Sequence, residues 1–569
     1  MRGRDPRHPG MSVAAQRLAA PRDFRGAFRT DVAARAAYSE SAGIAQAWPR
    51  AVAVPEDADA VVTLVQWANS VRQPLIARGS GSSMAGGATG DGVIVDLSRL
   101  REVGSITRRE ATIAPGIADH STHTVVLGPG VLCGELERLA ASHGLRFPVD
   151  PSSSAFCTVG GMAATNAAGP HTLSAGAMRP WVMGLECVFA DGTRAWVRRG
   201  APPCDLPVPH RLSAWRNAPD ATPGVRSAAV RKEASGYGVA PWRDSHELVD
   251  LLVGSEGTLA LFTAIEVALE PQPGASATVL AAFATLEAAT AGATEARSHG
   301  AATCELLDRT LLDLARSGSQ AVPVTSDTEA VLLIGVERER ADLVQVAAAT
   351  LAESLRAVGA THVVLGLSPD EEDALWALRH AASPMLAALD PAMASVQVIE
   401  DGCVPPERLA DYVRGVRAAL VRRRFPGVIF GHAGDAHVHV NPLVDLREPD
   451  WRERLEALVD DVVSLTASMG GTLSGEHGDG RLRPSLNARV HGHAAMAAWA
   501  AIKRAADPDD RLNPGVIVPI AGQHALDRIK YDPSLPALPA AARSALDLVS
   551  STRAYGRSRL ELVDASAGR

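Results

Sequence analysis

The sequence has few lysines and no closely spaced cysteines, and it carries no excess of positive charge. Its only lysines are Lys232, Lys503 and Lys530, which disfavours a lysine Schiff base. Its six cysteines include no CxxC pair, so it lacks ligands for a zinc ribbon or a cysteine-bound iron–sulfur cluster, and the scattered thiols favour a reducing compartment. The net charge of -8 disfavours nucleic acid and anionic lipid as partners. We therefore expect small-molecule partners and no nucleic acid.

The sequence also lacks a recognisable secretory signal and a membrane-spanning run. The basic first residues lead into charged sequence rather than an apolar segment. Residues 152–178 carry no Asp, Glu, Lys or Arg, but they include Pro170, Asn166 and several glycines, which disfavour a helix in lipid. We expect this run to surround a buried ligand. We also expect no transmembrane segment and a cytoplasmic protein, with peripheral docking on the inner membrane as the alternative.

Hydrophobic periodicity predicts an α+β chain, and 569 residues are enough for roughly two to four domains. The first part is predicted to contain helices at 56–70 and 131–144, strands at 74–77, 93–97 and 254–269, and a hairpin around Asp191–Gly192. The proline-rich segment 201–224 is expected to be exposed, and residues 271–274 to mark a domain boundary. Beyond them, strand-like runs alternate with predicted helices at 339–358, 370–389 and 405–423.

Two glycine-rich loops are the first candidate binding elements. The loop RGSGSSMAGG at 78–87 follows one predicted strand and runs into another. Its backbone N–H groups and serine hydroxyls could hold a pyrophosphate without adding charge. A Rossmann fingerprint is excluded because Met84 stands where the third glycine is needed and no helix follows. From the residues alone, a plain structural loop is an equally good interpretation.

The motifs ARGSGSSMAGG, GLRFPVDPSSSAFCTVGGMAATNAAG, GYGV and GSEGTLALFT resemble the flavoproteins of the vanillyl-alcohol oxidase type, in their D-lactate dehydrogenase and glycolate oxidase branch. The resemblance implies an α+β fold: a two-subdomain FAD-binding domain of the PCMH type, followed by an α+β substrate (cap) domain. The predicted divisions are a lead-in at 1–45, the FAD-binding domain at 46–273, the substrate and metal domain at 274–520, and a tail without recognisable chemistry at 521–569.

The same resemblance implies which residues contact FAD. They are Arg78, Gly79, Ser80, Gly81, Ser82, Ser83, Asp150, Pro151, Ser152, Thr158, Gly160, Gly161, Asn166, Gly254, Glu256 and Gly257. Ser82 stands where some relatives tether the flavin through a histidine, so noncovalent FAD is expected. Cys157 is interpreted as a small buried filler, with a cysteine–flavin link as the alternative.

A histidine-rich hairpin is predicted at 428–443. If His432 pairs with His437, then His437, His439 and Asn441 alternate onto one face, with His432 diagonal to His439. Glu476 and His477 lie between glycines in a second polar segment, SGEHGDGRLR. Two imidazoles and a carboxylate suit Zn²⁺ or a similar divalent ion. The alternative is that these histidines are only hydrogen-bonded.

The resemblance extends to FAD-linked D-2-hydroxyacid dehydrogenases, and it implies roles for this cluster. His432, His439 and Glu476 become metal ligands, with His437 as a possible competitor, and His477 becomes the base. Arg379, Ser383 and Asn441 are the implied substrate contacts, and Arg379 counts among the catalytic residues.

The expected reaction is oxidation of a D-2-hydroxy acid of the D-lactate, glycolate or D-2-hydroxyglutarate class, with the C2 hydride passing to flavin N5. No lysine occurs near 396–405 to hold a second carboxylate as in the hydroxyglutarate enzymes, which weakens a dicarboxylate substrate. Electrons are expected to reach an external acceptor: a separate iron–sulfur subunit, an electron-transfer flavoprotein, a quinone or a cytochrome. The alternatives are a flavin transferase similar to alkylglycerone-phosphate synthase and a noncatalytic flavin subunit of a larger oxidase.

Overall fold

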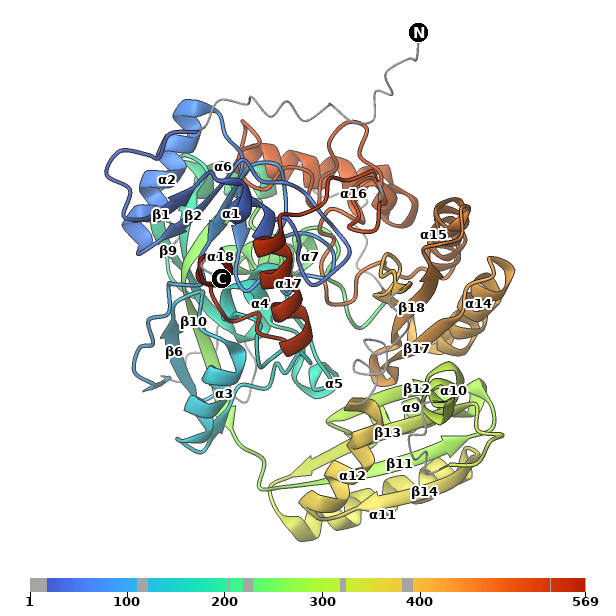
Figure 1. The fold of residues 1–569 in the computed structure, drawn as a ribbon. Helices are drawn as coiled ribbons and strands as arrows, with labels where there is room; N and C mark the ends of the chain where they lie inside the picture. The colour runs from blue at the N-terminus through green and yellow to red at the C-terminus, as the bar shows by residue number, and fades with distance from the viewer. Residues whose placement is uncertain are drawn as a thin grey trace.

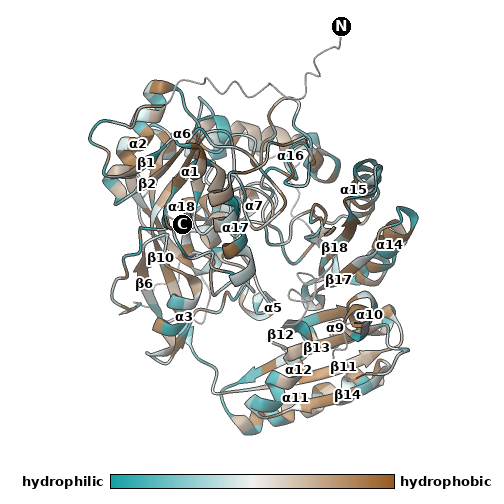
Figure 2. Cartoon of the chain, in the orientation of Figure 1, coloured by the Kyte–Doolittle hydropathy of each residue, from teal (hydrophilic) through white to brown (hydrophobic). Residues whose placement is uncertain are grey.

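The computed structural model describes residues 18–109, 121–202, 204–217, 229–317, 324–380, 392–532 and 534–567. These residues form three sheets with helices packed on them (Figure 1). Figure 2 shows hydrophobic residues concentrated along the strands. None of the described helices combines the length and apolar character needed to cross a membrane.

The first sheet carries the first glycine loop at one strand end. Its strand order is β1 (Gly26–Arg29), β2 (Ala51–Pro55), β4 (Val93–Asp96), β3 (Leu75–Arg78), with β2, β4 and β3 parallel. Helix α2 (Ala58–Val71) connects β2 to β3 and buries Val61, Leu64 and Val65. It begins where the Asp57 side chain accepts the N–H of Ala60, a standard N-cap. The loop after β3 is therefore held between two buried parallel strands.

The second sheet is antiparallel and carries the second glycine loop. Its order is β5 (Thr107–Arg108), β6 (His123–Leu127), β10 (Ala260–Pro271), β8 (Val182–Phe189), β9 (Arg194–Arg198), and β7 (Leu145–Arg146) also pairs with β10. The hairpin β8–β9 turns at Asp191–Gly192, as predicted, because Gly192 takes a φ of +82°. Helices α3 (Cys133–Ala141), α4 (Val159–Thr165), α5 (Thr172–Ala175), α7 (Val239–Ser245) and α8 (Leu248–Leu252) belong to this part of the chain.

The third sheet begins at β11, and three residues separate it from the end of β10 at Pro271. Its order is β14 (Ala360–Gly366), β11 (Ala275–Phe283), β13 (Ala330–Arg338), β12 (Thr303–Asp308), β17 (Gly427–His432), β18 (His437–Asp445), β15 (Met393–Ser395), and β16 (Gly402–Cys403) also pairs with β18. Alternate residues of β11 and β13 pack on helices α9 (Leu286–Ser298), α11 (Ala341–Ala357), α14 (Leu409–Arg422) and α15 (Trp451–Ser468). The other face packs on α10 (Arg309–Ser317) and α12 (Pro369–His380). The predicted helix at 370–389 extends past residue 380 into a segment outside the described residues.

Two segments differ from the sequence-based expectation. The proline-rich segment 201–224 is not simply an exposed loop, because Pro207–Asn217 forms helix α6 and buries Val208 and Leu212. Proline is tolerated in the first turn of a helix, where its missing N–H has no intrahelical partner. Helix α16 (Pro484–Ala506) contributes Trp499 to the hydrophobic core of the second sheet. That part of the predicted 274–520 domain therefore packs back onto the first half of the chain.

Candidate functional site

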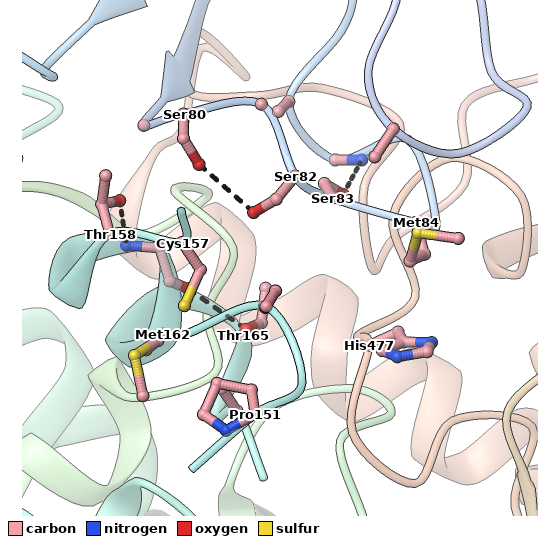
Figure 3. A pocket seen from close by; sticks show the side chains of 18 of the residues that line it. Ser80, Ser82, Ser83, Met84, Pro151, Cys157, Thr158, Met162, Thr165 and His477 are labelled. Atoms are coloured by element: carbon pink, nitrogen blue, oxygen red, sulfur yellow. Dashed lines mark hydrogen bonds between the residues drawn. The ribbon is translucent and has the colours of Figure 1, made fainter. Parts of the chain in front are cut away.

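A cavity of about 650 Å³ lies where the three sheets meet. Its wall comes from the loop after β3, from residues 151–168 at the start of the second sheet's helices, and from the third sheet. Figure 3 shows Ser80 and Thr158 on one side and His477 on the other. The volume falls in the usual range of cofactor and ligand sites, about 300–1,000 Å³.

The end of the cavity near Ser80 is lined by hydroxyls and close-packed backbone. A Cβ added to Gly79 would lie 2.2 Å from Thr158 Oγ1, so only glycine allows this approach of the two loops. The Thr158 hydroxyl also accepts the N–H of Gly161 at 3.2 Å. Ser80 and Ser82 share a hydrogen bond at 3.3 Å. This end therefore offers neutral donors to a ligand that passes along it.

Most of the residues predicted to contact FAD lie in this wall, whereas Asp150, Asn166 and Gly254 do not. The Asp150 carboxylate pairs with His171 at 2.7 Å, and Asn166 Oδ1 accepts the N–H of Arg179 at 2.9 Å. These side chains stabilise the loops instead of facing the cavity.

Arg78 and Glu256 lie in the wall, but their charged groups contact the protein. The buried Arg78 guanidinium donates to the carbonyls of Glu40 and Ala88. The Glu256 carboxylate accepts the N–H groups of Asp479 and Gly480, at 2.7 and 3.0 Å. Burial raises the pKa of Glu256 to about 8. Glu256 thus supports the turn that carries His477.

The histidine hairpin lies at the opposite end of the cavity, where His439 forms part of the wall. Strands β17 and β18 pair His432 with His437 and Phe430 with His439, as the alternation predicts. The three imidazole rings lie 4.8–5.4 Å apart, centre to centre. The turn 474–483 brings Glu476 to the same place. Ligand atoms of His432, His437, His439 and Glu476 all lie within 4.8 Å of one another, and all four residues are buried.

Each histidine is anchored through one ring nitrogen and presents the other to Glu476. Nδ1 of His432 bonds Glu305, Nε2 of His437 bonds Asp401 at 2.8 Å, and Nδ1 of His439 bonds the Glu400 carbonyl at 3.2 Å. The remaining nitrogens lie 3.5, 3.8 and 3.4 Å from Glu476 oxygens. Nδ1 of His437 is buried with no hydrogen-bond partner among the described residues. Metal-bound histidines are held in this way, so the donor set fits a divalent cation.

Two of the three hairpin imidazoles have lowered pKa values, which favour the neutral form that a metal ligand needs. Burial lowers the pKa of His437 to about 3 and also lowers that of His439. For His432, burial is outweighed by the Glu305 carboxylate, which raises the pKa to about 9. A cation would therefore have to displace a proton from His432 at neutral pH.

His477 lies beside two carboxylates. Its backbone N–H donates to Asp401 at 2.9 Å, and its ring Nδ1 bonds Glu400 at 3.1 Å. Burial lowers its pKa, but Asp401 and Glu400 outweigh burial and raise the pKa to about 10. With Nδ1 occupied, Nε2 is the atom that can exchange a proton with a ligand, and it lies 3.5 Å from Glu476.

Arg379 and Asn441 complete this end of the cavity. Arg379 Nε donates to Glu305 at 3.0 Å, and the guanidinium lies over the Phe430 ring. Asn441 Oδ1 accepts from Gln397 at 2.9 Å, which leaves its amide N–H groups to donate. Ser383 lies outside the described residues.

Comparisons with known proteins match both halves of the chain. Residues 49–198 match an FAD binding domain, and residues 272–517 match the FAD linked oxidases, C-terminal domain. The two matches together cover most of the chain and identify it as an FAD-linked oxidoreductase. The α+β fold class predicted from the sequence is confirmed.

Curated relatives and solved structures resemble this FAD-linked oxidoreductase over most of its length. It is 29% identical to glycolate oxidase subunit GlcD of Bacillus subtilis (83% of this chain, 89% of the relative) and 29% identical to D-lactate dehydrogenase of Archaeoglobus fulgidus (82% and 91%). A structure of 4-ethylphenol oxidase from Gulosibacter chungangensis matches with a TM-score of 0.61 at 16% identity (86% of this chain, 94% of that one). Alkyldihydroxyacetonephosphate synthase matches with a TM-score of 0.57 at 17% identity (86% and 82%).

The sequence analysis missed several charged residues that organise the site of this FAD-linked oxidoreductase. Lys232 is buried and donates to Glu476 at 3.0 Å. Burial would raise the pKa of Glu476, but Lys232 and the histidines lower it well below its usual range. Glu305 bonds both His432 and Arg379. Asp401 bonds His437 and the N–H groups of Glu476 and His477. The one available signal was Glu400–Asp401, two adjacent acids after an apolar run.

Proposed function

We propose that this enzyme oxidises a small D-2-hydroxy acid to the 2-oxo acid with noncovalently bound FAD. The observation that carries the proposal is one cavity that runs from the neutral glycine loops to His439, Glu476 and His477, with His432 in the same cluster of ligand atoms. When bound, FAD would accept the C2 hydride at its N5 atom. The relatives named glycolate oxidase subunit and D-lactate dehydrogenase support a 2-hydroxy acid as the substrate.

The residues at the charged end have different roles in the proposed reaction. Arg379 has a planar fork that suits a carboxylate, and the Asn441 amide can donate to the same group. His477 accepts the hydroxyl proton at Nε2, because Nδ1 is held by Glu400. For this step its pKa has to fall from about 10. Neutralising Glu476 with a cation lowers that pKa, because it removes part of the negative charge beside the imidazole.

His432, His439 and Glu476 are the proposed ligands of a divalent cation such as Zn²⁺. His437 is the proposed fourth donor, because its buried Nδ1 has no hydrogen-bond partner among the described residues. A cation held there would polarise the substrate hydroxyl. Lys232 balances the negative charge that Glu476, Glu305 and Asp435 bring to this region.

The cavity wall also bears on whether the substrate carries a second carboxylate. Near Asn441 it contains Gln397 and Phe430, a neutral amide and an aromatic ring. Neither offers a charge to a second carboxylate, so D-lactate or glycolate is favoured over D-2-hydroxyglutarate. Electrons would leave for an external acceptor: an iron–sulfur subunit, an electron-transfer flavoprotein, a quinone or a cytochrome. We propose a cytoplasmic location, with docking on the inner membrane as the alternative.

Anaerobic mixing of the purified holoenzyme with separate D- and L-2-hydroxy acids tests the proposal. Flavin absorbance near 450 nm should bleach with a D-monocarboxylate, and a chelator should slow the bleaching. Turnover with dyes should greatly exceed turnover with oxygen, and acid precipitation should release the FAD. Absence of bleaching with every hydroxy acid would overturn the proposal. A transferase of the alkyldihydroxyacetonephosphate synthase kind would show no net flavin reduction.

A further inference from the structure

The last described segment of the chain forms a structure that lies beyond the family match, which ends at residue 517. We call residues 538–567 the C-terminal clasp. It consists of helices α17 (Ala540–Thr552) and α18 (Arg559–Ala567) and the turn between them. Both helices pack on α1 (Val32–Ala37), and the red clasp lies against the blue start of the chain in Figure 1. Their buried residues are Ala542, Ala545, Val549, Leu560, Leu562 and Val563.

The turn of the clasp touches both halves of the FAD-binding domain. Arg559 donates to the carbonyl of Ser80, in the first glycine loop, at 2.9 Å. The Tyr555 ring lies 5.1 Å from the ring of Phe156, beside the second loop. One short turn therefore connects the two loops between which a dinucleotide would lie.

The clasp also contributes to the cavity wall, through Ser550, Arg553 and Tyr555. The Arg553 guanidinium makes no hydrogen bond or ion pair with the described residues, whereas those of the other two arginines of the wall, Arg78 and Arg379, donate to protein acceptors. The clasp contacts Ser80, which lies across the cavity from His477 (Figure 3). Arg553 therefore supplies a cation at the neutral end of the cavity. Apart from Arg78, whose guanidinium is held by protein carbonyls, the loop residues in this part of the wall are uncharged.

We propose that the clasp is part of the FAD site and binds the part of the cofactor that contains the diphosphate. Arg553 would pair with a phosphate, and Tyr555 with Phe156 would cover the nucleotide with aromatic surface. The inference rests on FAD binding alone and is independent of the substrate. A purely structural role would leave α17 and α18 to bury α1 without any effect on cofactor affinity.

The test measures FAD affinity directly, by quenching of flavin fluorescence on titration of the full-length apoprotein. The variants are Arg553→Asn, Tyr555→Ala and the double variant. Asparagine is chosen because Arg553 has a φ of 53°, a conformation that asparagine adopts readily. The matched control is Arg557→Asn, which removes the same charge from an exposed residue of the same turn that is not in the cavity wall. Circular dichroism of each apoprotein checks that the clasp helices are retained.

We expect the Kd of FAD to rise about three- to tenfold for each single variant and about thirtyfold for the double variant. Arg557→Asn should stay within about twofold of wild type, and Arg553→Lys should recover most of the affinity. ADP should compete with FAD in the wild type, and Arg553→Asn should weaken ADP while leaving FMN unchanged. An unchanged Kd in the double variant, or equal weakening by Arg557→Asn, would overturn the clasp proposal. Failure of the wild-type apoprotein to bind FAD would instead overturn the proposed function.

Discussion

The two ends of the cavity are built from different kinds of groups for binding a ligand. Near Ser80, the two glycine-rich loops present hydroxyls and backbone to the cavity, and positions such as Gly79 are fixed by close approach. Near His477, buried acids and bases are packed within hydrogen-bonding distance of one another, and several pKa values are displaced. One end depends on chain geometry and the other on charge balance. Substitutions at the two ends should therefore fail in different and separable ways.

The largest difference between the effect on turnover and the effect on FAD and cation binding is expected from His477→Ala. Turnover should fall by about two to four powers of ten, the usual contribution of a general base. FAD and cation content should stay at wild-type levels, because neither group is held by this ring in our proposal. Steady-state kinetics, the 450 nm absorbance and elemental analysis measure the three quantities. Loss of FAD together with turnover would show that the two ends are not independent.

Lys232→Met tests the charge balance. Removal of the buried ammonium leaves Glu476 without its lysine partner and leaves Asp435 with Arg231 alone, and breaking a buried pair in this way costs about 3–5 kcal/mol. The midpoint of thermal unfolding of the metal-free protein should fall clearly. Adding Glu476→Gln to the same variant should restore part of the loss. If Lys232→Met alone unfolds like wild type, the ion pair does not contribute to stability.

At the neutral end, Gly79→Ala should weaken FAD binding by about ten- to a hundredfold. The new Cβ would displace Thr158, whose cap on helix α4 is worth about 1 kcal/mol, and with it the adjoining loop wall. Gly134→Ala is the control, since its nearest contact would be an ordinary 3.4 Å. Cation content should be unaffected in both variants. Equal FAD affinity in the two would contradict the close-approach argument.

His437→Asn examines the number of cation ligands. If Nδ1 of His437 is a fourth donor, its loss should weaken cation binding by about tenfold, comparable to the loss of a supporting contact. FAD affinity should not change. Isothermal titration of the metal-free protein with Zn²⁺ gives the affinity and the stoichiometry. Unchanged affinity would leave three ligands and assign His437 to the hydrogen-bond network.

The smallest expected effect is a difference between the pH dependence of cation affinity and that of FAD affinity. The pKa of His432 is raised to about 9, so below that pH the metal-free site holds a proton that a cation must displace. Cation affinity should therefore fall as pH is lowered from 8 to 6, by up to about tenfold per unit. FAD affinity over the same range should change much less. A flat cation profile would mean that His432 is neutral before binding.

The sequence could predict the features that short-range rules determine. Glycine spacing located the loops, the pairing assumed for His432 with His437 is the one observed, and the Asp191–Gly192 turn located a hairpin. The pairing of Lys232 with Glu476 joins residues 244 positions apart, and no local pattern contains that information. The same holds for Glu305 with His432. Helix α6 was missed because its prolines suggested an exposed loop.

The contact between Arg559 and Ser80 spans 479 positions of the chain, and this has a consequence for biosynthesis. At about 5–20 residues per second, roughly half a minute to a minute and a half separates the synthesis of the first glycine loop from that of the clasp. In the nascent chain the first glycine loop is therefore exposed until the clasp has been made. We expect nascent chains to acquire stably held flavin only after the clasp has left the ribosome.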